Sequence, residues 1–307
     1  MNERINTGQE GYRSGFVTLY GSPNVGKSTL MNALLGQKVA IVSAKAQTTR
    51  TRIRGVLSMA QAQIILIDTP GVQAPKNRLG EYMAKAGAQA LRDVDCILYV
   101  ADPTAGIRER DEAILAQIKG QNTPAIAAVN KADIASPEQM AAARERLAKE
   151  GWLKDVMTCS AATGKGLTEL IDRLLTFMPE GPQYFPEDMV TDQPERMLCA
   201  EFIREACLQN LDQEIPHGIA VEVDKMAMRE DKELYDIWAT IYCERESHKR
   251  ILIGKNGSML KKIGASARKQ IEWLMDARIN LQLWVKVRER WRESPSALQD
   301  LGYREEL

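Results

Sequence analysis

A nine-residue loop near the N-terminus constrains the fold of this chain more than any other stretch. An apolar, β-prone run precedes it and an apolar helical pattern follows it, which predicts a strand, a loop and a helix in that order. The loop matches the P-loop pattern, in which glycines let successive backbone N–H groups curl around phosphates at a helix N-terminus. Its residues are Gly21, Ser22, Pro23, Asn24, Val25, Gly26, Lys27, Ser28 and Thr29.

Two side chains of this loop have predictable chemistry. Lys27 is expected to reach the β- and γ-phosphates of a nucleotide, and the Ser28 hydroxyl is expected to ligate Mg²⁺. The alternative is an ordinary glycine-rich turn between a strand and a helix. The full nine-residue match in this context favours the nucleotide site.

Composition and pattern indicate a two-domain globular protein of 307 residues. Five dispersed cysteines without a CxxC pair are typical of reduced thiols, and the first residues lack the apolar core of a signal peptide. The sequence has no run of about 18 apolar residues, which a membrane-spanning helix would need. We therefore expect a cytoplasmic protein.

Strand and helix patterns alternate through the first half, which predicts an α/β domain over residues 15–178 after a flexible N-terminus, 1–14. Its apolar strands indicate a mostly parallel sheet with helices on both faces, and ligands of such sheets bind at the carboxyl ends of strands. Three prolines and a glycine within residues 179–186 predict a linker over 179–190. The order helix–strand–strand–helix–helix–strand then predicts an α+β domain over 191–307.

A second motif follows the strand pattern of residues 63–67. Asp68 lies where that strand ends and is placed to hold Mg²⁺, and the Gly71 N–H is placed to contact the γ-phosphate and to report its loss. The alternative is a strand that ends in a simple turn, and the spacing after the P-loop disfavours it. The residues of this motif are Asp68, Thr69, Pro70, Gly71 and Val72.

A third motif follows another strand pattern and predicts guanine as the base. The Asp133 carboxylate can accept hydrogen bonds from guanine N1–H and the 2-amino group, neither of which adenine offers. Asn130 would brace the loops and the Lys131 stem would cover one face of the base, whereas the alternative is a helix-capping loop. Ser160 and Ala161 follow the next strand, and only their position suggests that their backbone contacts guanine O6. The residues of the motif are Asn130, Lys131, Ala132 and Asp133.

The P-loop, the Asp68 motif, the Asn130 motif and the Ser160–Ala161 pair together resemble the Ras-like P-loop GTPases. The segment Thr48-Thr49-Arg50 resembles the translation-factor-related branch of these GTPases. In those relatives the threonine directly before the arginine is a Mg²⁺ ligand, which implies Thr49 here, with Thr48 as the alternative. The metal ligands that the resemblance implies are Ser28, Thr49 and Asp68. The catalytic residues that it implies are Lys27, Thr49 and Gly71.

One position departs from the Ras pattern. Where those GTPases have a glutamine that orients water, this chain has Val72, which can neither donate nor accept a hydrogen bond. Related GTPases with an apolar residue here carry a P-loop asparagine, matched by Asn24, and in several of them that asparagine helps to bind K⁺. We therefore expect slow intrinsic hydrolysis that K⁺ or a partner stimulates.

The second domain contains a GxxG segment between two helix patterns, which resembles the loop of type II KH modules. Such loops let helices approach a nucleic-acid backbone and hold about four single-stranded nucleotides. Residues 245–292 hold thirteen basic and four acidic residues. Because the GxxG segment lies within this basic stretch, we favour RNA binding over the two alternatives, a simple turn between helices and a solvated charged face. Trp284 and Trp291 are candidates for base stacking, although Trp284 also fits a core position. The predicted RNA-binding residues are Ile253, Gly254, Lys255, Asn256, Gly257, Lys261 and Lys262.

A GTPase domain followed by a type II KH domain resembles the Era family of bacterial GTPases, over essentially the whole chain. The resemblance implies GTP/GDP and Mg²⁺ as ligands, with K⁺ as a further cation. It also implies a monomer that helps to assemble the 30S ribosomal subunit by binding the single-stranded 3′ end of small-subunit ribosomal RNA. The implied location is cytoplasmic, with peripheral association at the inner membrane.

Two other functions stay open at this point. One is an RNA-binding module that uses GTP as a structural ligand with negligible turnover, which Val72 leaves open. The other is a GTP-dependent RNA-modification factor. It would need a second catalytic centre, and the second half of the sequence shows no spare constellation of Cys, His and Asp.

Overall fold

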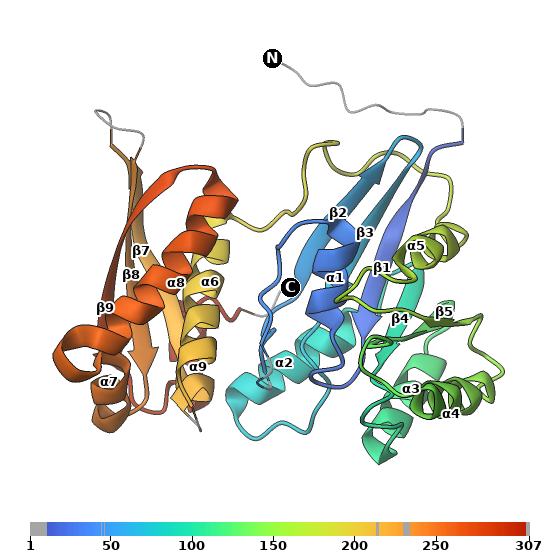
Figure 1. Cartoon of the computed structure of the whole chain (residues 1–307), viewed down its shortest axis with the longest axis horizontal. Helices are drawn as coiled ribbons and strands as arrows, with labels where there is room; N and C mark the ends of the chain where they lie inside the picture. The colour runs from blue at the N-terminus through green and yellow to red at the C-terminus, as the bar shows by residue number, and fades with distance from the viewer. Residues whose placement is uncertain (1–10, 44, 46, 213–214, 230–233, 305–307) are drawn as a thin grey trace. The chain divides into compact units, whose positions relative to one another are not determined.

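The computed structural model describes residues 11–43, 45, 47–212, 215–229 and 234–304. The chain divides into two compact units, which Figure 1 shows and which are described in turn. The first holds the chain up to Ala74 together with Met83–Asp192. The second holds Pro75–Tyr82 together with the chain from Gln193 onward.

The first unit is built on a six-stranded sheet with the order β2-β3-β1-β4-β5-β6. The β2–β3 pair is antiparallel, and the other four pairs are parallel. Every residue of β3, β4 and β5 is buried, as expected for strands covered on both faces, so the predicted mostly parallel sheet is confirmed. The strands are β1 (Arg13–Tyr20), β2 (Ile53–Met59), β3 (Ala62–Asp68), β4 (Cys96–Ala101), β5 (Ala125–Val129) and β6 (Val156–Thr158).

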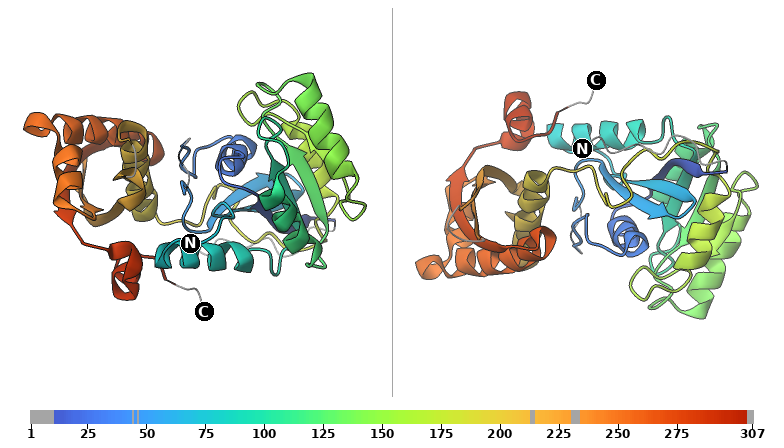
Figure 2. Two further views of the ribbon diagram at one scale, coloured as in Figure 1. Left: turned by 90° about the horizontal axis from the view of Figure 1, so that it is seen from below. Right: turned by 90° about the horizontal axis from the view of Figure 1, so that it is seen from above.

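Helices cover both faces of this sheet (Figure 2). Leu30 and Leu170, from α1 and α5, pack with Leu66 in one core, while Ile114 and Leu147, from α3 and α4, belong to the core on the other face. The carboxyl ends of β1, β3 and β5 therefore meet at one edge of the sheet, where the three predicted motifs follow them. The helices are α1 (Lys27–Leu35), α2 (Arg78–Gln89), α3 (Glu109–Lys119), α4 (Pro137–Ala148) and α5 (Leu167–Leu175). The part of α2 up to Tyr82 is counted with the second unit.

The proline-rich segment after α5 is bound to the first unit. The buried amide of Gln63 on β3 holds it from both sides: its Oε1 accepts from the backbone N–H groups of Tyr184 and Phe185, and its Nε2 donates to the Phe185 carbonyl, at 2.9–3.0 Å. Farther along, the Val56 N–H on β2 donates to the Val190 carbonyl at 2.8 Å. The predicted boundaries of the linker stay a prediction.

The start of the chain is held in a similar way. Residues 1–10 of the expected flexible N-terminus lie outside the described residues, and Arg13 and Ser14 already belong to β1. Arg13 pairs with Ala62 on β3, and the buried Ser14 hydroxyl donates to the Pro182 carbonyl at 2.7 Å.

The second unit has the predicted order helix–strand–strand–helix–helix–strand. Its sheet has the order β7-β8-β9, with β8 antiparallel to β7 and parallel to β9. α6 and α8 pack against each other, α6 against β7 and α8 against β9 (Figure 1). These elements are α6 (Glu195–Asn210), β7 (Ala220–Met228), β8 (Leu234–Cys243), α7 (Glu246–Ile253), α8 (Ser258–Met275) and β9 (Arg278–Val287).

A short helix without a helical period in its sequence, α9 (Pro295–Asp300), follows β9. The Ser294 hydroxyl accepts from the Ala297 N–H, and Pro295 occupies the first helical position. Ala297 and Leu298 are buried. The capping signal was therefore present in the sequence, within a segment too short to show a helical period.

The five cysteines are free and buried, which generates a test of the fold. Burial raises the pKa of Cys96, Cys159, Cys199 and Cys207 to about 12, and raises the pKa of Cys243 as well. At pH 8 the thiolate fraction of a group with that pKa is only ~10⁻⁴. We expect a thiol reagent such as Ellman's to leave the native protein unlabelled for minutes at pH 8. In guanidinium it should titrate five thiols, and rapid labelling of the native protein would contradict these burials.

Candidate functional site

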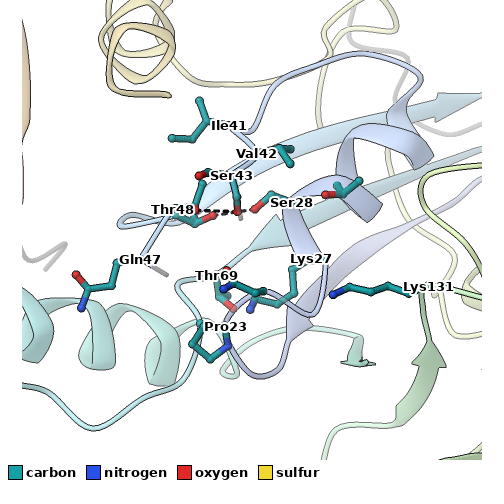
Figure 3. A pocket seen from close by; sticks show the side chains of 15 residues that line it. Pro23, Lys27, Ser28, Ile41, Val42, Ser43, Gln47, Thr48, Thr69 and Lys131 are labelled. Atoms are coloured by element: carbon teal, nitrogen blue, oxygen red, sulfur yellow. Dashed lines mark hydrogen bonds between the residues drawn. The ribbon is translucent and has the colours of Figure 1, made fainter. Parts of the chain in front are cut away.

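A cavity of about 390 Å³ lies at the carboxyl edge of the first sheet, a size that suits a small-molecule ligand (Figure 3). Six residues of the predicted P-loop line it, together with five other predicted residues. The P-loop residues are Pro23, Asn24, Gly26, Lys27, Ser28 and Thr29, and the others are Thr48, Thr49, Thr69, Gly71 and Lys131. The loop between α1 and β2 lines the rest, through residues that sequence reasoning did not single out. These are Ile41, Val42, Ser43 and Gln47.

The two P-loop glycines hold positions that a side chain could not occupy. Gly21 has a φ of 153° and Gly26 a φ of 99°. A Cβ at Gly21 would lie 2.5 Å from the Val100 carbonyl oxygen, and one at Gly26 would lie 2.4 Å from Asn130 Nδ2. Gly26 precedes α1, and it offers this end of the helix no side-chain cap. That arrangement leaves the first helical N–H groups to an anion.

Lys27 is buried, with 6% of its surface exposed. Its Nζ donates to the carbonyl oxygens of Gly21 and Ser22, each at 3.0 Å. Burial lowers the pKa of Lys27 to about 8; the charge of Asp68 opposes this shift and that of Arg110 adds to it. A buried ammonium that faces carbonyl dipoles is suited to receive a phosphate.

The three predicted metal ligands lie together. Asp68 Oδ2 accepts from the Ser28 hydroxyl at 2.6 Å and from the Thr49 hydroxyl at 3.0 Å, and the two hydroxyl oxygens are 2.8 Å apart. The other Asp68 oxygen, Oδ1, is buried and accepts no hydrogen bond from the described residues. Burial raises the pKa of Asp68, and the charge of Lys27 and the hydrogen bonds from the two hydroxyls oppose this shift. Two hydroxyl oxygens and a carboxylate with one unpartnered oxygen are hard ligands, and they fit Mg²⁺.

Thr48, the alternative ligand, also lines the cavity, but its hydroxyl has other partners. Its hydroxyl donates to the Lys45 carbonyl at 2.6 Å and, more weakly, to the Ser43 carbonyl at 3.4 Å. The structure therefore places Thr49, rather than Thr48, beside Ser28 and Asp68.

Gly71 lies directly against the P-loop. A Cβ there would come within 2.7 Å of Pro23 Cα, and the Val72 N–H donates to the Gly21 carbonyl at 3.2 Å. The Val72 side chain packs at the edge of the core that contains Tyr20. This position therefore offers the cavity a backbone contact at Gly71 and no polar side chain at Val72.

Asn130 connects the P-loop to the predicted base-binding residues. Its Nδ2 donates to the Val25 carbonyl at 3.1 Å, and its Oδ1 accepts from the Ala161 N–H at 3.0 Å. The buried Ser160 hydroxyl donates to the Asp133 carboxylate at 2.6 Å. Asp133, Ser160 and Ala161 thus form one group, and none of the three lines the cavity.

Lys131 has a partner that sequence reasoning missed. It adopts a left-handed backbone with φ 61°, and its Nζ lies 2.5 Å from Asp102 Oδ2. Asp102 directly follows β4. Like Asp68 and Asn130, Asp102 lies where a strand ends. That position alone could have identified it from the sequence.

The second unit presents the GxxG segment as an exposed turn. Gly254 has a φ of 70°, and a Cβ there would lie 2.8 Å from the backbone nitrogen of Met259, so glycine is required. Gly257, also left-handed, precedes α8. The four polar side chains that we predict to contact RNA are all exposed, namely Lys255, Asn256, Lys261 and Lys262.

The two candidate stacking tryptophans differ. Trp284, on β9, is 44% exposed. Its interpretation as a core residue is therefore wrong, and its side chain is accessible to a base. Trp291 is fully buried and its Nε1 donates to the Gly218 carbonyl at 2.9 Å, so it is a core residue instead. Its place four residues after the end of β9 did not indicate this burial.

Family models match both units. The model of the 50S ribosome-binding GTPase matches residues 16–131, and the KH domain model matches residues 214–292. Together they follow the same division of the chain as the fold.

Whole-chain relatives agree with both models. The GTPase Era of Alkaliphilus oremlandii (strain OhILAs) is 49% identical over 292 residues, which cover 95% of this chain and 99% of that protein. The GTPase Era of Clostridioides difficile (strain 630) is 49% identical over 293 residues, with the same coverage.

Solved structures give the same result in three dimensions. A crystal structure of Era in complex with MgGDPNP and nucleotides 1506–1542 of 16S ribosomal RNA has a TM-score of 0.92, 40% identity and 96% coverage of this chain, and is itself covered completely. A single-residue variant of Aquifex aeolicus Era bound to GDP.AlF4- also has a TM-score of 0.92 at 40% identity, over 95% of this chain and all of its own. This chain therefore belongs to the Era family of GTPases.

Proposed function

We propose that this GTPase couples its nucleotide state to the binding of single-stranded RNA, the 3′ end of small-subunit ribosomal RNA, during assembly of the 30S subunit. The observation that carries the proposal is the presence of two features in one chain. One is a cavity whose residues fit a nucleotide and Mg²⁺, and the other is an exposed GxxG turn with lysines. The relative at 40% identity that holds MgGDPNP together with nucleotides of 16S ribosomal RNA supports it.

The proposed reaction is in-line attack of water on the γ-phosphorus of GTP. Mg²⁺, for which Ser28, Thr49 and Asp68 supply oxygens, would add positive charge against the phosphate oxygens. Lys27 and the P-loop N–H groups would stabilise the negative charge that develops in the transition state. The Gly71 N–H would contact the γ-phosphate, so the backbone at Gly71 would change when the γ-phosphate is lost.

Guanine selection would follow from the group around Asp133. Its carboxylate is exposed and accepts one hydrogen bond, from Ser160, so it retains acceptor capacity for two base N–H donors. Asn130 fixes the Ala161 backbone that would contact guanine O6. An adenine in this site would leave the carboxylate without its donors.

Thr49 supplies the first test of the metal site. Thr49→Ala should lower GTP turnover about a hundredfold and raise the Mg²⁺ concentration needed for half-maximal rate, because one of three grouped oxygens is lost. Multiple-turnover phosphate release against Mg²⁺ concentration measures both. Thr48→Ala, which removes a hydroxyl bound to loop carbonyls, is the control and should stay within about twofold. The reverse ranking would identify Thr48 as the ligand.

Asn24 supplies a test of the second cation. We propose that K⁺ supports hydrolysis where Val72 offers no polar group, and Asn24 lines the cavity beside Lys27. Phosphate release should be about tenfold faster in KCl than in NaCl at one ionic strength, which corresponds to about 1.4 kcal/mol of transition-state stabilisation. Asn24→Ala should remove the difference between the salts, and equal rates in both salts for the unmodified protein would end this part of the proposal.

The exposed lysines test the RNA face. Gly254 is unsuitable for substitution because of its contact with the Met259 backbone, whereas Lys255→Glu and Lys261→Glu alter only exposed side chains. The double variant should bind a ribosomal 3′-end oligonucleotide at least tenfold more weakly and lower the slope of log affinity against log salt by about 1.4. Lys119→Glu, exposed on α3, is the matched control. An unchanged affinity and slope would exclude this face.

One further measurement separates the alternatives. Multiple-turnover phosphate release with and without the oligonucleotide distinguishes a working GTPase from a module that holds GTP as a structural ligand. Stimulation by RNA that the lysine variant loses supports coupling between the units. Equal rates in all samples, with RNA bound, would leave two independent activities.

We base the proposed location and assembly state on the family resemblance. No helix in the described ranges is long and apolar enough to cross a bilayer. We propose a cytoplasmic monomer that associates peripherally with the inner membrane, an assignment supported by the resemblance to Era proteins.

A further inference from the structure

Ser22 of the P-loop faces away from the cavity and toward the start of α3. Its hydroxyl donates to Asp111 Oδ1 at 2.5 Å and accepts from Arg110 Nε at 3.0 Å. Ser22 and Asp111 are buried, with 2% and 6% of their surfaces exposed. Because Arg110 occupies the oxygen as a donor, the single hydroxyl hydrogen is left for Asp111.

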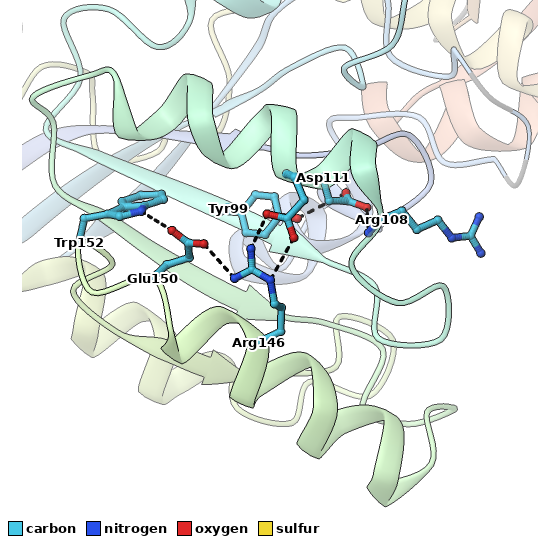
Figure 4. A network of polar contacts seen from close by, with 7 residues as sticks. Tyr99, Arg108, Asp111, Arg146, Glu150 and Trp152 are labelled. Atoms are coloured by element: carbon cyan, nitrogen blue, oxygen red, sulfur yellow. Dashed lines mark hydrogen bonds and ion pairs between the residues drawn. The ribbon is translucent and has the colours of Figure 1, made fainter.

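Asp111 is itself held on two further sides (Figure 4). The Tyr99 hydroxyl on β4 donates to the same Oδ1 at 3.4 Å, and the Arg108 backbone N–H donates to Oδ2 at 3.1 Å. The bond from Arg108 closes the first turn of α3. The carboxylate is therefore fixed between a strand and a helix terminus, so it can act as a rigid anchor for the P-loop.

The backbone of Ser22 contacts the catalytic lysine. Its carbonyl oxygen accepts from Lys27 Nζ at 3.0 Å, while its hydroxyl is bound to Asp111. We propose that Asp111 and Ser22 are positioning residues for GTP hydrolysis: the carboxylate fixes the Ser22 peptide, whose carbonyl orients the Lys27 ammonium toward the phosphates.

The chemistry of this site makes such positioning consequential. Stabilisation of transition-state charge depends on donors that are already in place, and a displacement of about 1 Å can cost ~10² in rate. Val72 supplies no side chain that orients water, so more of the catalysis rests on Lys27. A hydrogen bond to a buried carboxylate is charge-assisted, and it is stronger than one between neutral groups.

The test compares two hydroxyls that donate to one carboxylate oxygen. Ser22→Ala and Tyr99→Phe each remove a hydroxyl from Asp111 Oδ1, but only Ser22 also contacts Lys27. In the full-length protein, Ser22→Ala should lower kcat about tenfold with the KM for GTP changed less than about threefold. Tyr99→Phe should leave kcat within about twofold. Thermal midpoints of both variants measure the stability cost that they share.

Three further measurements separate positioning from other roles. Asp111→Asn keeps an oxygen for the Ser22 hydroxyl and should retain more activity than Asp111→Ala. Arg110→Met removes only the guanidinium and should change kcat less than about threefold. The Mg²⁺ dependence of Ser22→Ala should match that of the unmodified protein, because Ser28, Thr49 and Asp68 are untouched.

Several results would overturn the inference. These are equal kcat losses for Ser22→Ala and Tyr99→Phe, a rise in KM alone, a changed Mg²⁺ requirement, or an Arg110→Met variant that reproduces the whole loss. The inference rests on GTP hydrolysis at this site and not on RNA. A failure of RNA to stimulate turnover would therefore contradict the proposed coupling and leave this inference standing.

Discussion

The buried charges of Lys27 and Asp68 are the constraint on which the first unit depends. Taking a single charge out of water costs several kcal/mol, and such groups persist in proteins when a partner compensates them. Within the described chain Lys27 faces carbonyl oxygens, and Asp68 accepts two hydroxyls at one oxygen and none at the other. The fold therefore leaves part of the compensation to a ligand, an anion at Lys27 and a cation at Asp68.

Much of this site could be predicted because its motifs are local and follow one topological rule. The P-loop, Asp68 and Asn130 each follow an apolar strand, and the carboxyl ends of parallel strands meet at one edge. Asp102 obeys the same rule but belongs to no familiar motif. Asp111 lies inside a helix and reaches Ser22 only through the packing of α3 against the sheet, so no spacing in the sequence announced it.

The second unit shows the same division between local and non-local information. The GxxG turn depends on backbone conformations that only glycine adopts easily, so the residues themselves reported it. Trp291 follows a strand pattern and precedes a short helix, and a tryptophan there can stack on a base or enter a core. Its hydrogen bond to Gly218 comes from 73 residues away, and a contact at that separation is set by tertiary packing.

The segment predicted as a linker illustrates a further limit of composition. Prolines and glycine predict a linker there, yet they do not show what the segment binds. Gln63, a buried polar residue within an apolar strand, was the sign that something must satisfy its amide. The partners prove to be the nearby Ser58 hydroxyl and backbone groups of Tyr184 and Phe185, 121 and 122 residues later in the chain.

A second set of contacts binds the end of this segment close in sequence to Thr49. β2 begins at Ile53, four residues after Thr49, and Arg54 forms an ion pair with Asp192 at 2.7 Å. The Thr191 hydroxyl also donates to the Arg54 carbonyl at 2.6 Å. Asp192 is the last residue of the first unit. Arg54, five residues after Thr49 in the chain, is therefore bound through its side chain and its carbonyl to the residues that end the first unit, on a strand that is paired along its length with β3.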